Sequence, residues 1–259
     1  MKKSLKKITE NSKIVIEKIK NELNIYIEQY RNIEIFGKIT QIFFIQKYAI
    51  GNIFKPVLFS LILYFIGFFI LNLTTIQYFI YGIFSLILFI SLGLFIGIIL
   101  LIRNLKKDLL TITQQSTELV EKIYVDICNT NTNNFEKLKN PLTLIFEGIL
   151  IGLVQPKISS SVTNIPLVGN IVDNGIDKTI PILIENFKKQ EDKFNISEKA
   201  ENIGNQILNK IEKSKIIINA YLSKIENTIS KSISFISFPI YTITIILFIV
   251  LLIFILAIN

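Results

Sequence analysis

The sequence contains no histidine, no tryptophan and a single cysteine, Cys128, among its 259 residues. Without histidine the chain lacks the commonest general base, the imidazole metal ligand and the usual pH switch. One cysteine cannot form a disulfide within the chain or build a cysteine-based zinc or iron–sulfur site. Glycine-rich phosphate loops, nucleotide fingerprints and nucleophile elbows are also missing from the sequence. We therefore predict no catalytic, cofactor-binding or metal residues, no cofactor and no enzymatic activity.

Arginine is scarce as well, because only Arg31 and Arg103 are arginines among 28 basic residues. The formal charge of +8 would suit a nucleic-acid partner, but arginine is the residue favoured for bidentate phosphate and base recognition. The abundance of Ile, Asn, Lys and Phe is typical of an AT-rich genome. We expect no nucleic-acid binding, and we assign the lysines to orienting the protein in a membrane.

Charged residues are absent from three long apolar runs, and the mean hydropathy of the chain is +0.52. The first run, 57–73, follows Pro56 and corresponds to about 25 Å of helix, near the minimum for crossing a bilayer. The second, 78–102, is separated from it by the polar break 72–77, and the third is 236–258. The sequence predicts an all-α integral membrane protein with an N-terminal two-helix transmembrane hairpin, a cytosolic helical domain and a C-terminal transmembrane helix.

We divide the chain into four regions on this basis. Residues 1–55 form a basic amphipathic helical region with 11 basic and 5 acidic residues, and 56–102 form the hairpin. Residues 103–235 form the cytosolic domain, and 236–258 the last span. The stripe of Val15, Ile19, Leu23 and Ile27 predicts an amphipathic helix. Packing on the rest of the protein is favoured over lying on the membrane surface, because its polar face mixes lysine with glutamate.

Apolar stripes at helical spacing continue through the cytosolic domain. The first predicts one helix that ends near 129–134, a run of Asn and Thr. The second, 168–180, is expected to break at Pro181, and residues 157–166 are interpreted as a loop. The third, 203–229, is either a coiled-coil seam or a face packed on neighbouring helices, and it is expected to run into the last span. The first stripe comprises Leu105, Leu109, Ile112, Leu119, Ile123 and Ile127.

The apolar segment 141–156 is ambiguous. Pro141 and Pro156 bracket it, it is short for a crossing, and Glu147 lies in its middle. A buried helix or a shallow re-entrant segment fits better than a span. Glu147 is interpreted as lying on the exposed side of an amphipathic helix; the alternative is a desolvated carboxylate with a raised pKa or a lysine partner.

Two pairs of glycines at i, i+4 spacing predict close helix packing. They are Gly93 with Gly97 in the second span, and Gly148 with Gly152 in the ambiguous segment. Packing of Gly93 and Gly97 within the hairpin is favoured over self-association between chains. Tyrosines at the membrane–water interface are also predicted, with Tyr64, Tyr78 and Tyr81 as candidates.

The positive-inside tendency predicts a cytosolic N-terminus and an outside C-terminus, in what we expect to be a bacterial inner membrane. The predicted membrane-orienting residues flank the spans: Lys55, Arg103, Lys106, Lys107 and Lys231.

The spans lack ionisable residues, which disfavours coupled transport. Residues 103–235 carry 17 basic and 15 acidic residues, a balanced set suited to protein contacts. We therefore predict a non-enzymatic, membrane-anchored scaffold or interaction protein. Its partners would be the bilayer and either a protein or further copies of itself through the cytosolic helices, with no small-molecule substrate. The alternative is a membrane-perturbing protein of the holin-like or pore-forming kind.

Overall fold

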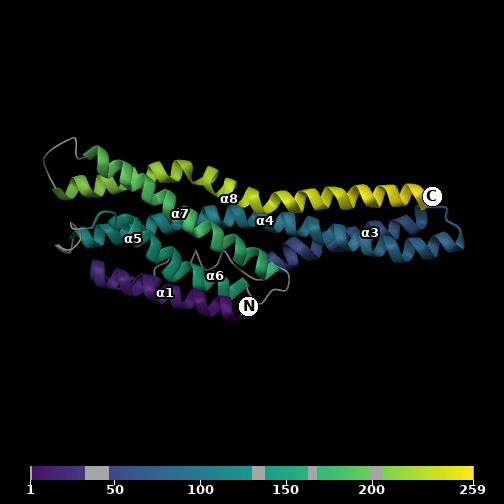
Figure 1. Ribbon diagram of the computed structural model, residues 1–259, viewed down its shortest axis with the longest axis horizontal. Coiled ribbons are helices and arrows are strands. Elements are labelled where there is room, and N and C mark those ends of the chain that lie inside the picture. The colour runs from purple at the N-terminus through teal and green to yellow at the C-terminus, as the bar shows by residue number, and fades with distance from the viewer. Residues whose placement is uncertain (1, 33–46, 130–137, 163–167, 199–205, 259) are drawn as a thin grey trace. The chain divides into compact units, whose positions relative to one another are not determined.

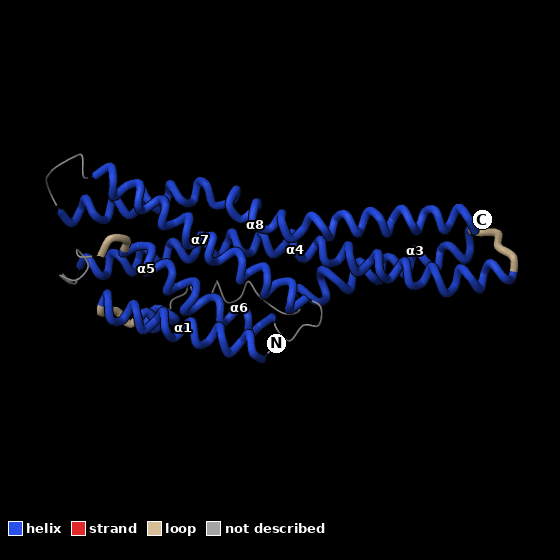
Figure 2. The backbone as a smooth tube through the Cα atoms, viewed as in Figure 1, coloured by secondary structure: helices blue, strands red, loops and turns tan. Residues whose placement is uncertain are grey.

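The computed structural model describes residues 2–32, 47–129, 138–162, 168–198 and 206–258. Every regular element in these ranges is a helix, with seven α-helices and three shorter 3-10 or π-helical stretches (Figures 1 and 2). The predicted all-helical fold is confirmed. Four helical segments are long and apolar enough to cross a membrane, which indicates a membrane protein: Gly51–Ile70, Thr75–Asn129, Pro141–Ser160 and Ser237–Ile258.

The chain folds into two compact units. Unit 1 comprises Met1–Phe43 and Lys107–Ser232, and unit 2 comprises Phe44–Lys106 and Ile233–Asn259. Two long helices, α4 (Thr75–Asn129) and α8 (Gln206–Ile258), contribute residues to both units. Their continuity follows from the sequence, because the only proline within either helix is Pro239.

Unit 2 begins with the π-helical stretch η2 (Lys47–Phe54) and α3 (Lys55–Ile70). A short turn then leads into α4. The N–H of Thr74 donates to Oε1 of Gln77 at 2.7 Å, and the N–H of Tyr78 donates to the carbonyl of Thr74 at 2.9 Å. This is one half of a capping box, with the glutamine at N3 reaching back to the N-cap N–H. The polar break at 72–77 therefore contains the turn and the first turn of α4.

Tyr64 and Tyr81 join α3 to α4 inside unit 2. Their rings stack with centroids 5.7 Å apart. The Tyr81 hydroxyl donates to the carbonyl of Tyr64 at 2.9 Å, and the Tyr64 hydroxyl donates to the carbonyl of Gly82 at 3.0 Å. Both side chains are buried and find their hydrogen-bond partners within the protein. Their position at the membrane–water interface stays a prediction.

Unit 2 carries most of the apolar surface. Among the described residues, every exposed large apolar side chain lies in unit 2 except Ile14, Tyr26, Ile182 and Ile216. A soluble protein seldom exposes a contiguous apolar surface on this scale, whereas lipid-facing helices require one.

Unit 1 has a closed core. It contains α1 (Lys2–Leu23), η1 (Ile27–Asn32), α5 (Pro141–Glu147), the π-helical η4 (Gly148–Val154), α6 (Gln155–Val162) and α7 (Val168–Glu198), with parts of α4 and α8. The six residues of the stripe predicted between 105 and 127 are all buried, five of them in unit 1 and Leu105 in unit 2, and α4 ends at Asn129 as predicted.

An aromatic cluster ties three elements of unit 1 together. Phe146 of α5 stacks on Phe187 of α7 with centroids 4.6 Å apart, and Tyr221 of α8 meets both rings edge-on at 5.6 and 4.9 Å. The buried part of the third stripe, Ile218 to Ile229, also packs within unit 1, while Ile203 lies outside the described residues.

Two predictions about helix ends are wrong. Residues 157–162 belong to α6 and not to a loop, while the rest of the predicted loop, 163–166, lies outside the described residues. Helix α7 continues through Pro181. Pro156 lies in the first turn of α6, where the N–H that proline lacks would have no hydrogen-bond partner within that helix. Each π-helical stretch ends two residues before a proline, η2 before Pro56 and η4 before Pro156. A proline removes one N–H and clashes with the carbonyl four residues earlier, so a locally wider helix lets the chain pass the ring while staying helical.

Candidate functional site

The predicted packing glycines of unit 2 lie against the chain that precedes and opens the first span. A Cβ added to Gly93 would meet Ser60 and would lie 2.8 Å from the Cα of Val57. A Cβ added to Gly97 would lie 2.8 Å from the carbonyl oxygen of Asn52 in η2. Asn52 also accepts a hydrogen bond from the side chain of Asn104 at 2.7 Å, so this corner of unit 2 is joined by both backbone approach and polar contact.

The predicted packing glycines of unit 1 both face α1. A Cβ added to Gly148 would collide with the side chain of Ile19 and would lie 2.6 Å from Cδ1 of Ile27. A Cβ added to Gly152 would lie 2.9 Å from Cγ1 of Ile16. Isoleucines of α1 and η1 thus fill the space that the two glycines leave on η4.

The predicted membrane-orienting residues belong to different units. Lys55, Arg103 and Lys106 lie in unit 2, and Lys107 and Lys231 lie in unit 1, close to where α4 and α8 pass from one unit to the other. All except the half-buried Lys106 are exposed.

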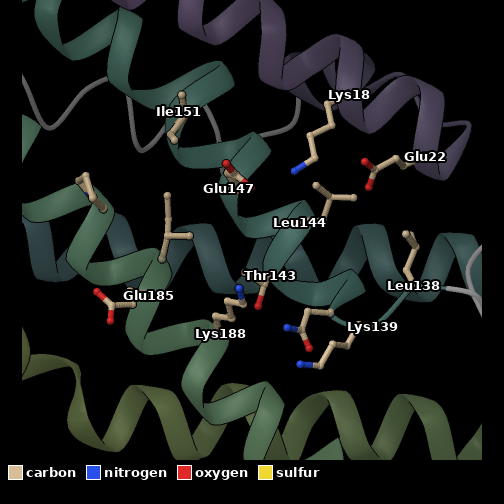
Figure 3. Close-up of a pocket in the computed structure, with 13 residues that line it drawn as sticks. Lys18, Glu22, Leu138, Lys139, Thr143, Leu144, Glu147, Ile151, Glu185 and Lys188 are labelled. Atoms are coloured by element: carbon tan, nitrogen blue, oxygen red, sulfur yellow. The ribbon is translucent and has the colours of Figure 1, made fainter.

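A cleft of about 600 Å³ lies in unit 1 (Figure 3). Helix α1 supplies Lys18 and Glu22, and α7 supplies Glu185 and Lys188. The segment 138–151 and two further residues of α7 form the rest of the wall. Lys18 extends from α1 toward α5, and Lys188 extends from α7 toward Thr143 (Figure 3). The apolar lining consists of Leu138, Leu144, Ile151, Pro181 and Ile184.

A buried carboxylate fixes the wall of this cleft. Glu191 of α7 is 2% exposed, and its Oε1 accepts the N–H of Leu142 at 3.0 Å. Its Oε2 accepts the N–H of Thr143 at 2.8 Å and the Thr143 hydroxyl at 2.5 Å. The first N–H groups of a helix have no partner within it. Glu191 therefore caps α5 from another helix and holds the cleft-lining Thr143 in place.

The neighbouring Asp192 secures the chain just before α5. Its Oδ1 accepts a hydrogen bond from Asn140 at 3.1 Å and lies 3.3 Å from the ammonium of Lys139. The hydrogen bond from Asn140 and the charge of Lys139 lower the pKa of Asp192. Burial has the opposite effect on Glu191, because desolvation raises its pKa despite the three donors.

Charged side chains of both signs line the cleft. Three lysines and three glutamates line it, and Glu185 also forms an ion pair with Lys189 at 2.7 Å, which lowers the pKa of Glu185. Glu147 is half-buried and lines the cleft, so it lies between the exposed and desolvated alternatives considered from the sequence.

Sequence reasoning singled out Glu147 and the glycines but missed Lys18, Lys188 and Glu191. The lysines look like ordinary residues of a solvated helix face, and Glu191 lies 48 residues from Thr143. The only local signal was Asn140 before Pro141, which has the pattern of a helix start. Asn140 makes no side-chain cap bond of its own.

Among the described residues, no group of three or more acidic, Cys or His side chains is placed to hold a metal ion. Cys128 is half-buried, and burial raises the pKa of its thiol, which disfavours the reactive thiolate.

No family model, no curated protein and no solved structure matches the chain. The chemistry of the two units therefore carries the functional argument.

Proposed function

We propose that the protein is a membrane-anchored binding protein, in which unit 2 holds the chain in the bilayer and unit 1 binds a protein partner through the cleft. Three spans anchor it, the hairpin formed by α3 with the first part of α4 and the last part of α8. The N-terminus and unit 1 lie in the cytosol, and the C-terminus lies outside the membrane.

The proposal rests on the difference between the surfaces of the two units. Exposed large apolar side chains are concentrated in unit 2, as lipid contact requires. In the segment Pro141–Ser160, 72% of the 18-residue apolar stretch is buried inside the protein, against 11, 39 and 6% of the corresponding stretches in the other three helices. Lipid is thus not needed to cover it, and it serves as the core of a folded domain.

The lining of the cleft favours a protein partner over a small molecule. Small-molecule sites have a few fixed polar groups that orient the ligand. Here the two uncharged polar residues, Asn140 and Thr143, are already bonded to carboxylates of α7. The remaining polar groups are long charged side chains beside apolar ones, a combination typical of a protein interface with a charged rim.

The experiment replaces residues 56–102 with an unrelated, inert transmembrane hairpin of the same length. In a second variant, Lys18→Glu and Lys188→Glu reverse the charge on opposite walls of the cleft. Proteins crosslinked to each variant in membranes are then compared with those of the wild type. We expect the hairpin replacement to retain the wild-type partners and the charge reversal to lose them, because only the second alters the cleft.

The matched control is Lys13→Glu with Lys178→Glu. It changes one lysine on each of the same two helices, both exposed and neither lining the cleft. If both double variants lose the partners equally, the loss would follow from the change in net charge and not from the cleft. Loss of function in the hairpin replacement, with the protein folded and inserted, would favour the membrane-perturbing alternative.

A further inference from the structure

The segment Pro141–Ser160 combines two properties that seldom occur together in a soluble core. Its 20 residues include an 18-residue stretch that is apolar enough to cross a membrane, yet 72% of that stretch is buried inside the protein. We infer that this segment has a second site, in the cytosolic leaflet of the bilayer, which it occupies when α1 leaves it. This inference rests on the proposed topology, which places unit 1 in the cytosol, and it goes beyond the proposed binding of a partner.

Helix α1 is the removable cover. It contacts η4, α5 and α6, and runs beside α6 (Figure 1). The contact with η4 is apolar, with Ile19 filling the space at Gly148 and Ile16 the space at Gly152. No backbone pairing is lost when two helices part along such a face, since each helix satisfies its own N–H and C=O groups. Lipid can then replace the same apolar contacts, because acyl chains are as apolar as isoleucine.

Polar contacts hold both ends of the segment to α7. Glu191 caps its first residues. Near its other end, the side chain of Gln155 donates to Asp177 at 2.8 Å, and the hydroxyl of Ser159 donates to Asp173 at 2.7 Å. Both ends therefore stay on the side of the membrane where α7 lies. Insertion is re-entrant and does not add a crossing.

The charges of the segment limit its depth. Glu147 lies seven residues into it and Lys157 near its end. A charged side chain is disfavoured at the bilayer centre but is tolerated near the headgroups, where long side chains reach water. The stretch between them, Gly148 to Val154, is uncharged and wholly π-helical, and it is the part that enters the acyl region.

Photolabelling in vesicles tests this inference. The full chain is reconstituted into phosphatidylethanolamine and phosphatidylglycerol vesicles that contain a hydrophobic carbene-generating probe. Label in 141–160 is measured by mass spectrometry relative to label in α3. Gly148→Ile leaves no room for Ile19, and Ile19→Ala removes most of the same contact from the other side. We expect several-fold more label in 141–160 for Gly148→Ile than for the wild type, with Ile19→Ala between them. Gly51→Ile is the control, since an added Cβ there meets nothing within 4 Å.

A disulfide between α1 and η4 provides a second test that does not depend on the packing variants, either of which could unfold unit 1. In a Cys128→Ser background, Ile16→Cys with Gly152→Cys places two thiols where Cγ1 of Ile16 and the added Cβ lie 2.9 Å apart. The oxidised tether should show less label in 141–160 than the same protein after reduction. Label in the reduced tether that spreads equally over α7 would show that unit 1 unfolds as a whole, which would contradict insertion of 141–160 alone. Equal label in the oxidised and reduced tether, or equal label in the wild type and both packing variants, would overturn it.

Discussion

Glu191 is the residue on which the cleft depends most. It replaces a local N-cap, because Asn140 directs its side chain to Asp192 and makes no cap bond. A buried carboxylate without partners would be strongly unfavourable, but three donors surround this one. The cap therefore links α7 to α5 and places the Thr143 wall of the cleft.

We expect Glu191→Gln to destabilise unit 1 by about 1–3 kcal/mol, the range for leaving a buried group unsatisfied. The amide has one acceptor oxygen, so one of the two N–H groups it must cap would face the amide's own NH₂. Chemical unfolding followed by circular dichroism measures the loss, and amide exchange should accelerate in α5. Glu185→Gln on the same helix is the control, since its side chain is 62% exposed, and its unfolding should match the wild type.

The same variant predicts a pH dependence. Burial raises the pKa of Glu191 above its ordinary value of 4.5, so the folded state binds this proton more tightly than the unfolded state. Its contribution to stability is complete below pH 4.5 and is lost as the pH rises through the folded pKa. The stability difference between wild type and Glu191→Gln should therefore shrink as the pH rises from 4.5 toward neutrality. A difference that grows over this range would mean that hydrogen bonding outweighs desolvation.

At the scale of elements, the spacing of apolar residues correctly predicted which helix face is buried. The stripe from Leu105 to Ile127 is buried, and α4 ends where the Asn and Thr run begins. The prolines predicted helix ends less well. Pro181 lies within α7, and Pro156 opens α6 directly after a π-helical stretch. Whether a proline ends a helix depends on whether the carbonyl group four residues earlier, which loses its N–H partner, can be accommodated, and that is a property of the fold.

The glycine pair of the hairpin gives an element-scale prediction. Replacing Gly93 and Gly97 with isoleucine should force η2 and α3 away from α4, because the new Cβ atoms would lie 2.8 Å from backbone atoms that cannot rotate away. Overpacking of this kind destabilises by about 1–3 kcal/mol. Crosslinking between cysteines introduced into α3 and α4 should fall. Gly51→Ile is again the control, and crosslinking unchanged in the double variant would refute close packing through these glycines.

At the scale of the whole molecule, the sequence separated apolar from polar regions but could not decide where the segment from Pro141 is buried. Its length and hydropathy suit a membrane, while its burial depends on α1, α7 and α8, which come from distant parts of the chain. The cleft was unpredictable for the same reason, because its walls meet only in the folded unit. No local pattern marks Lys18, Thr143 and Lys188 as neighbours.

The most direct test of the account is whether residue 259 and the 72–77 turn lie on the same side of the membrane. With three spans, and Pro141–Ser160 kept in unit 1, both lie outside, and the re-entrant state does not alter this. If Pro141–Ser160 were a fourth crossing, the two sites would lie on opposite sides. Reporter domains fused at Asn259 and inserted within 72–77 measure this in intact cells. We predict an outside signal from both sites; an outside signal at the turn with a cytosolic signal at Asn259 would contradict the account.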